Sequence, residues 1–318
     1  MNLNLLHFDD ALLGQPRFLE TCESAGAHQI DLRGIGPAIR LWATAPQIDD
    51  VRRRLRNSMV GLDDKRPLVT WLGSGDFHHV TAVIVELLAE HQTAPVTILH
   101  FDNHPDWVAH RNGLHCGSWI NHVLATGLAS RVITIGVTSR DLAWPEFKGA
   151  GLEFVASGQL VIIPIDPPRT WLWRNMPAGP AHRMQGSQLI WSDLDQNSGH
   201  ERLTAIRDLI ETDAVYITID KDALDSPDAI TNWDQGQLSV ESLLQCVSAL
   251  TTGRTVVGID VVGDHSSPEF AGSLVTLALK RSEALADQPW RSYPKEAAAH
   301  VNQATNLRLL AAFEAQLC

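Results

Sequence analysis

Two short stretches of the sequence place carboxylates and imidazoles two residues apart. Residues 102–106 read Asp-Asn-His-Pro-Asp, and residues 220–222 read Asp-Lys-Asp. In an extended chain every second side chain points the same way, so the members of each set can converge on one point. Carboxylate oxygens together with imidazole nitrogens suit Mn²⁺ and related divalent ions. The two stretches therefore predict a metal site.

A third stretch, residues 73–79, reads Gly-Ser-Gly-Asp-Phe-His-His. Its glycines let the chain turn sharply, so that His78 or His79 would open the following helix at the same edge of the fold. Four aspartates with two histidines are more ligands than one ion needs, and we expect two ions that share bridging carboxylates. An isolated Asp-x-Asp is more often a helix cap or a turn, but three such stretches together favour a metal centre.

The elements that position these motifs follow from the apolar pattern around them. Strands are predicted over 68–72, 96–101, 132–137, 160–165, 215–219 and 256–262, and helices over 79–91, 118–128, 201–211, 240–250, 269–286 and 295–316. Strands that are apolar on both faces and alternate with helices indicate a mostly parallel sheet covered on both sides. We therefore expect one domain over residues 1–318, a doubly wound three-layer αβα sandwich with functional residues at the carboxyl ends of its strands.

One segment, residues 167–199, breaks this alternation. It is irregular and carries Trp171, Trp173 and Trp191. Two interpretations stay open: a functional lid or interface element, or a surface excursion packed by its own tryptophans. Asp193 and Asp195 also form Asp-x-Asp, but no apolar strand leads into them, so they are not counted as ligands.

Composition limits the class of protein and its partners. The 318 residues are 44% hydrophobic and 19% charged, which is typical of a globular protein with a large core. A net charge of -12 disfavours nucleic acid and anionic membranes as partners and is compatible with a cationic small molecule. The four cysteines lack CxxC spacing, and neither a signal peptide nor a membrane span is evident. We expect a cytoplasmic protein with reduced thiols.

The order of the three motifs resembles the arginase/agmatinase/formiminoglutamase (ureohydrolase) family. The matching stretches are Ser-Gly-Asp-Phe-His at 74–78, Asp-Asn-His-Pro-Asp at 102–106 and Asp-Lys-Asp-Ala-Leu-Asp at 220–225. Gly-Leu-His-Cys-Gly at 113–117 is similar to the Asn-Leu-His-Gly stretch of that family. The resemblance covers about 68–268. It implies an arginase-like fold, two Mn²⁺ ions, a homo-oligomer, and hydrolysis of a C–N bond in a guanidino, amidino or formimino small molecule.

The resemblance also implies a role for each matching residue. The six ligands would comprise a bridging pair, Asp102 and Asp220, a pair on one ion, His78 and Asp106, and a pair on the other, His104 and Asp222. A metal-bridging hydroxide would attack the trigonal carbon of the substrate. Asp106 would pass the proton of the hydroxide to the leaving amine, and His115 would be the outer proton shuttle.

The sequence departs from the family pattern at two places. Phe77 stands where the family has its first-turn ligand, so His78 is the predicted ligand and His79 the fallback. Gly263 stands where the family has the Glu that pairs with a guanidinium, so Asp264 is the candidate for that role.

Two further residues, Asp141 and Trp233, are predicted substrate contacts. Asp141 follows the strand over 132–137, where family members place a contact to the substrate tail, and Trp233 lies in a loop near the site.

Two other functions remain as alternatives. One is amide hydrolysis with a single zinc, as in the related deacetylases, which the intact Asp-x-His-x-Asp disfavours. The other is a metal-stabilised protein without turnover, which the presence of His115 disfavours. Cys116 beside His115 could suggest a nucleophile, but no neighbouring residue would activate its thiol.

Overall fold

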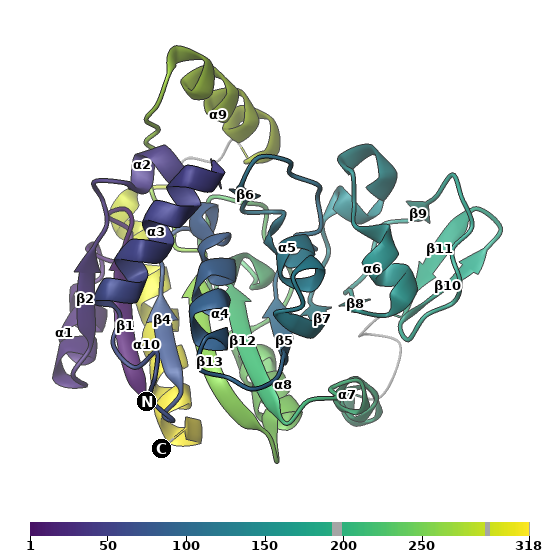
Figure 1. Ribbon diagram of the computed structural model, residues 1–318, viewed down its shortest axis with the longest axis horizontal. Helices are drawn as coiled ribbons and strands as arrows, with labels where there is room; N and C mark the ends of the chain where they lie inside the picture. The colour runs from purple at the N-terminus through teal and green to yellow at the C-terminus, as the bar shows by residue number, and fades with distance from the viewer. Residues whose placement is uncertain (193–198, 290–292, 318) are drawn as a thin grey trace.

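A central sheet of eight parallel strands forms the middle layer of the molecule (Figure 1). The computed structural model describes residues 1–192, 199–289 and 293–317. The strand order is β2-β1-β4-β13-β12-β5-β7-β8. The strands of this sheet are β1 (Asn2–His7), β2 (His28–Asp31), β4 (Leu68–Trp71), β5 (Val96–Phe101), β7 (Ala129–Ile135), β8 (Leu160–Ile163), β12 (Ala214–Asp220) and β13 (Thr255–Val262).

Helices cover both faces of the sheet and give the expected three layers. The α-helices are α1 (Pro16–Ser24), α2 (Gly36–Ile39), α3 (Ala45–Ser58), α4 (Val80–Ala89), α5 (Trp119–Ala125), α6 (Leu152–Ser157), α7 (Gly199–Asp208), α8 (Val240–Thr251), α9 (Leu274–Asp287) and α10 (Lys295–Leu317). Successive residues of β5 point to opposite faces: Ile98 packs in the core beneath α3, α4 and α5, and Leu99 in the core beneath α1, α8 and α10. Central strands such as β5 are therefore buried on both sides, as their continuous apolar sequence predicted, whereas the edge strand β2 is mostly exposed.

The six predicted strands and the six predicted helices are all present, and most helix bounds differ by a few residues at either end. The last helix but one was predicted from residue 269 but begins at Leu274. Ser273 caps it, because the Ser273 hydroxyl accepts a hydrogen bond from the backbone N–H of Thr276. The sequence pattern did not predict β1 and β2, which extend the sheet beyond β4.

The segment that breaks the alternation contains a small antiparallel sheet of its own. Its strands are β9 (Thr170–Trp171), β10 (His182–Gln185) and β11 (Gln188–Trp191), and a separate pair is formed by β3 (Trp42–Ala43) and β6 (Leu114–His115). Trp191 is buried and donates a hydrogen bond from Nε1 to Thr170 Oγ1 at 2.7 Å. Trp191 therefore packs part of the described segment, and whether the segment is a lid or interface element stays open. Asp193 and Asp195 lie outside the residues that the structure describes.

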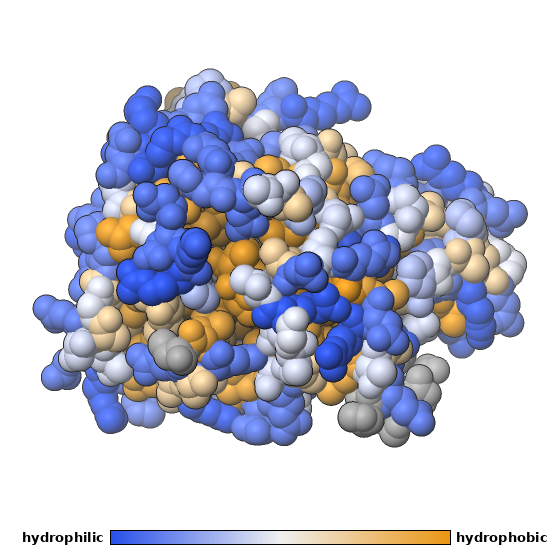
Figure 2. Space-filling model, turned by 60° about the horizontal axis from the view of Figure 1, so that its bottom comes forward, coloured by the Kyte–Doolittle hydropathy of each residue, from blue (hydrophilic) through white to orange (hydrophobic). Residues whose placement is uncertain are grey.

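The hydrophilic surface and the free cysteines of the described residues are consistent with the composition of the chain. Figure 2 turns the lower end of the molecule towards the viewer and shows hydrophilic residues over most of this face, with hydrophobic residues gathered towards its middle. No helix within the described ranges is both long and apolar enough to cross a membrane. Cys22, Cys116 and Cys246 are buried and free, and Cys318 lies outside the described ranges.

Candidate metal centre

The predicted ligands gather at the carboxyl ends of three strands, β4, β12 and β5, with β13 between β4 and β12 in the sheet. The turn after β4 supplies one histidine, the segment after β5 supplies a second histidine and two aspartates, and the end of β12 supplies two more aspartates. All six line one cavity of about 800 Å³: His78, Asp102, His104, Asp106, Asp220 and Asp222. Because the carboxyl ends of parallel strands meet at one edge, motifs far apart in the sequence become neighbours.

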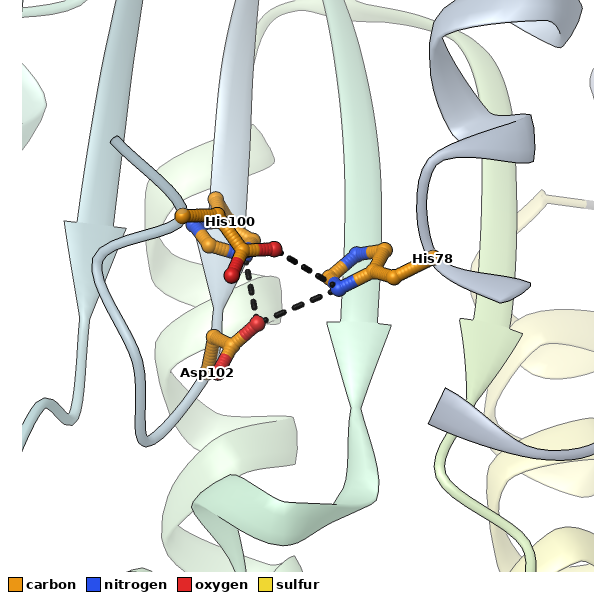
Figure 3. Close-up of side chains that lie close together, drawn as sticks. His78, His100 and Asp102 are labelled. Atoms are coloured by element: carbon orange, nitrogen blue, oxygen red, sulfur yellow. Dashed lines mark hydrogen bonds and ion pairs between the residues drawn. The ribbon is translucent and has the colours of Figure 1, made fainter. Parts of the chain in front are cut away.

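His78, rather than His79, enters this cluster. His78 Nδ1 lies 3.2 Å from Asp102 Oδ2 and 3.1 Å from Asp106 Oδ2 (Figure 3). His79 is fully buried, does not line the cavity and belongs to no group of potential ligand atoms among the described residues, so the fallback ligand is wrong. The turn needs Gly75, because a Cβ there would lie 2.6 Å from Asp220 Oδ2.

A chain of hydrogen bonds fixes the tautomer of His78. Tyr216 OH and Thr218 Oγ1 donate to the two oxygens of Asp260, at 2.5 and 2.6 Å. The only proton of the Thr218 hydroxyl is thereby used, so Thr218 Oγ1 accepts from His78 Nε2, which is 2.9 Å away. Nδ1 of a neutral His78 then carries a lone pair that faces two carboxylates. Such an arrangement requires a proton or a metal ion at Nδ1.

His104 repeats this arrangement on the other side of Asp102. His104 Nε2 donates to Asp234 Oδ1 at 2.8 Å, while Nδ1 lies 2.9 Å from Asp222 Oδ2 and 3.5 Å from Asp102 Oδ1. The two oxygens of Asp102 thus face different histidines, as a bridging carboxylate would. Asp106 has a φ of 45°, a strained value for a non-glycine residue that functional sites often hold.

The sequence analysis missed two residues of this cluster. His100 Nε2 lies 2.9 Å from Asp102 Oδ2, and His100 belongs to a group of potential ligand atoms with His78, Asp102 and Asp106. Trp119 Nε1 donates to Asp106 Oδ2 at 2.7 Å. The signal for His100 was its position two residues before Asp102, which places both on one side of β5.

The pKa shifts of the buried aspartates and histidines show that the cluster needs added positive charge. Burial, and then the charge of Asp102, raise the pKa of Asp220 to about 7, and burial raises that of Asp222 well above its ordinary value. Burial alone would lower the pKa of His78 and His104, but the surrounding carboxylates hold both well above the usual range. Divalent ions would supply this charge in place of protons, so the donor set fits a metal centre.

His115 lies on the wall of the same cavity with both ring nitrogens engaged. The backbone N–H of Gly117 donates to Nδ1 at 2.8 Å, so Nε2 carries the proton and donates to Glu283 Oε1 at 2.5 Å. Glu283 belongs to α9, and the sequence analysis did not select it. Cys116 is beside this pair, but burial raises the pKa of its thiol well above normal, which disfavours a nucleophilic role.

Asp264 does not face the cavity, which corrects its selection as a substrate contact. Its buried carboxylate binds Lys221 Nζ at 2.6 Å and accepts from Gln15 Nε2 at 2.7 Å. Gly263 has a φ of 94°, and a Cβ there would lie 2.3 Å from Asp220 Oδ1. No side chain at position 263 fits this backbone.

Trp233 and Asp141 line the cavity near its mouth, where they stay predicted substrate contacts. Trp233 Nε1 donates to Asp76 Oδ1 at 2.9 Å, and Asp76 also binds the buried Arg40 at 2.7 Å. Asp141 pairs with Lys148 Nζ at 2.6 Å. Asp76 thus ties the loop of Trp233 to the turn that carries His78.

Comparison with known proteins gives concordant results. Residues 27–159 match the model of the arginase family. An uncharacterized protein of Thermotoga maritima is 26% identical over 202 residues, which span 64% of this chain and 60% of that protein. The formimidoylglutamase of Bacillus subtilis superimposes with a TM-score of 0.57 at 14% identity, covering 99% of this chain and 87% of its own. The arginase of Bacillus subtilis gives 0.56 at 12% identity, covering 96% and 98%.

The parallel sheet, with carboxylates and imidazoles clustered at its carboxyl edge, defines an α/β protein of the arginase-like fold. The match of residues 27–159 to the family model and the shared fold both make the chain similar to the arginase, or ureohydrolase, family.

Without metal, the protein should lose stability as the pH rises from 5.5 to 7.5. The pKa of Asp220 is about 7 in the folded state against 3.8 for the free side chain, so the native state binds more protons over this range. The free energy of unfolding then falls with increasing pH. The melting temperature of chelator-treated protein should drop by several degrees, because a loss of about 1 kcal/mol shifts it by roughly 2–4 °C in a large domain. Addition of Mn²⁺ should restore the melting temperature. Asp220→Asn should flatten the slope, whereas a rising melting temperature would contradict the assignment.

Asp264→Ala should destabilise the fold without raising KM. Removing one partner of a buried ion pair costs about 3–5 kcal/mol, because the remaining charge of Lys221 stays buried. Chemical denaturation measures this loss, and the double variant Lys221→Met/Asp264→Leu should recover much of it. A normal free energy of unfolding with a raised KM would instead make Asp264 a substrate contact.

Proposed function

We propose that the protein is a binuclear metal-dependent hydrolase that cleaves a C–N bond of a guanidino, amidino or formimino small molecule. The observation that carries the proposal is the convergence of imidazole lone pairs and carboxylates at His78, His104 and Asp102, which only cations can stabilise. The match of residues 27–159 to the arginase family model supports hydrolysis as the reaction class.

Six ligands would hold two divalent ions, Mn²⁺ in our proposal, and the ions would supply a water ionised at neutral pH as the nucleophile. Asp102 would contribute to both positions, because its two oxygens face different histidines. Asp106 would take up the proton released from the water and pass it to the leaving amine. The hydrogen bond from Trp119 holds Asp106 in place for this step.

His115 would be the outer proton shuttle. The backbone N–H of Gly117 occupies Nδ1 and leaves the ring proton on Nε2, which donates to Glu283. To take up a second proton, Nδ1 would have to turn away from Gly117, and the carboxylate of Glu283 would then stabilise the imidazolium form.

The position of Glu283 also favours a cationic substrate. Position 263 carries no side chain, and Glu283 is the carboxylate that α9 places beside His115 in the cavity. Asp234 and Asp287 add negative charge to the same lining. A guanidinium or amidinium group would therefore meet carboxylates that are not needed as metal ligands. We further propose that the protein is cytoplasmic, forms a homo-oligomer, and binds neither nucleic acid nor membranes.

An amide hydrolase with a pair of adjacent histidines is the weaker alternative. That mechanism needs both imidazoles in the site, and His79 does not line the cavity.

A substrate screen on metal-loaded protein tests the function. We expect about two Mn²⁺ per chain, and release of urea or ammonia from at least one guanidino, amidino or formimino compound. Asp102→Asn should abolish both metal binding and release, because it removes the shared ligand. Full metal loading without turnover on any such compound would contradict the proposed reaction.

Glu283→Gln should weaken the use of cationic substrates selectively. A hydrogen bond to a charged group contributes about 1.5–3 kcal/mol, so kcat/KM should fall roughly 10- to 100-fold. The matched control is Asp287→Asn, one helical turn away on α9 and nearer the mouth, which should have a smaller effect. Metal content measured on both variants should equal that of the wild type, and an unchanged kcat/KM in Glu283→Gln would exclude its role.

A further inference from the structure

His100 is a polar residue inside the central strand β5, at a position where the neighbouring residues are apolar. It is fully buried, and its ring contacts His78 at 5.2 Å and Trp119 at 5.3 Å between centroids. Burying an imidazole in a sheet core is costly unless both ring nitrogens are satisfied. The surroundings of His100 should therefore reveal what the ring does.

The two nitrogens of His100 have different neighbours. Nδ1 lies 3.0 Å from Thr134 Oγ1, on the adjacent strand β7, and Nε2 lies 2.9 Å from Asp102 Oδ2. His78 and His104 show the same arrangement: one nitrogen is held by a neighbouring polar group and the other faces Asp102. Figure 3 shows the rings of His78 and His100 on either side of the Asp102 carboxylate.

The separations between the facing atoms match a coordination shell. His78 Nδ1 is 3.2 Å from Asp102 Oδ2 and 3.1 Å from Asp106 Oδ2, and His100 Nε2 is 2.9 Å and 3.9 Å from the same two oxygens. Ligands about 2.0–2.1 Å from a tetrahedral ion lie about 3.3 Å from one another. The four atoms lie within 4.8 Å of one another. They can therefore surround one ion with little movement.

We propose that His100 Nε2 is a direct ligand of one of the two ions, which is then held by His78, His100, Asp102 and Asp106. The inference rests on the metal centre of the proposed function, but not on the reaction. Thr134 Oγ1 can accept the Nδ1 proton of His100, and in that tautomer Nε2 is free for the metal.

The additional imidazole makes the two metal positions unequal. The first has two nitrogens and two carboxylates, whereas the second, around His104 and Asp222, has one nitrogen and is otherwise carboxylate. Imidazole-rich sites favour Zn²⁺, Co²⁺ or Fe²⁺, and carboxylate-rich sites suit Mn²⁺. The protein should therefore take up different metals at its two positions when offered a mixture.

The experiment measures metal content and affinity of the full-length chain, with Zn²⁺ and Mn²⁺ as probes. Metal-free wild type is equilibrated with one equivalent of each ion, and elemental analysis should find one Zn²⁺ and one Mn²⁺ per chain. X-ray absorption at the zinc edge should show two imidazoles on the zinc. One imidazole on the zinc would overturn the proposal.

Two substitutions separate ligation from positioning. His100→Ala removes both, whereas His100→Gln keeps an N–H that can donate to Asp102 but supplies a poor ligand for zinc. Both should weaken Zn²⁺ binding more than 100-fold, beyond the 10- to 100-fold typical of losing an outer hydrogen bond. Affinity within tenfold of wild type in His100→Gln would show that His100 only orients Asp102, and would overturn the proposal.

A matched control and a folding check complete the design. His79→Leu removes an adjacent buried histidine that lies outside the cluster, and it should keep the wild-type zinc affinity. Melting curves of the metal-free variants identify any that fail to fold, and the zinc-edge spectrum of the wild type decides the question if His100 variants do not fold. Wild type that binds neither ion would overturn the whole metal centre, whereas wild type that binds both while His100→Ala is unaffected would overturn only the role of His100.

Discussion

Four carboxylates buried at one edge of a parallel sheet repel one another, and much of the structure around them serves to hold them together. Asp102, Asp106, Asp220 and Asp222 are each less than a tenth exposed. Burial and mutual repulsion push the pKa of Asp220 to about 7, so protons or metal ions must share the space. The cluster is stable only with added positive charge, and this requirement connects the fold to its chemistry.

The surrounding polar network decides how that charge can be supplied. Thr218 holds the far nitrogen of His78, and Asp234 holds that of His104, so that the other nitrogens are presented to the carboxylates. Outer partners of this kind fix the tautomer and orientation of metal ligands. Further from the potential ligands, the ion pair of Arg40 with Asp76 supports the turn that carries His78. The metal centre therefore depends on residues that never contact an ion.

The substrate side of the cavity departs from the family pattern more than the metal side does. Its distinctive feature is α9, which brings Glu283 to His115 and is anchored by Lys280, whose ammonium donates to backbone oxygens of residues 38, 40 and 42. The backbone at Gly263 leaves no room for a side chain. In a fold shared with solved structures at 12–14% identity, this chain therefore places a carboxylate from α9 beside the cluster of potential metal ligands.

The sequence by itself determined the features that depend on local spacing. The i, i+2 pattern of 102–106 and 220–222 follows from strand geometry, and apolar runs such as Val96–Phe101 form buried strands in any parallel sheet. Only the tertiary structure decided between His78 and His79, because the choice depends on how the turn at Gly75 directs each side chain. The same is true of His115 and Glu283, which are 168 residues apart and meet because Lys280 anchors α9 to the backbone of residues 38, 40 and 42. Spacing along the chain determines which side chains of one motif can point to the same side. Packing between distant elements determines which residues those side chains meet.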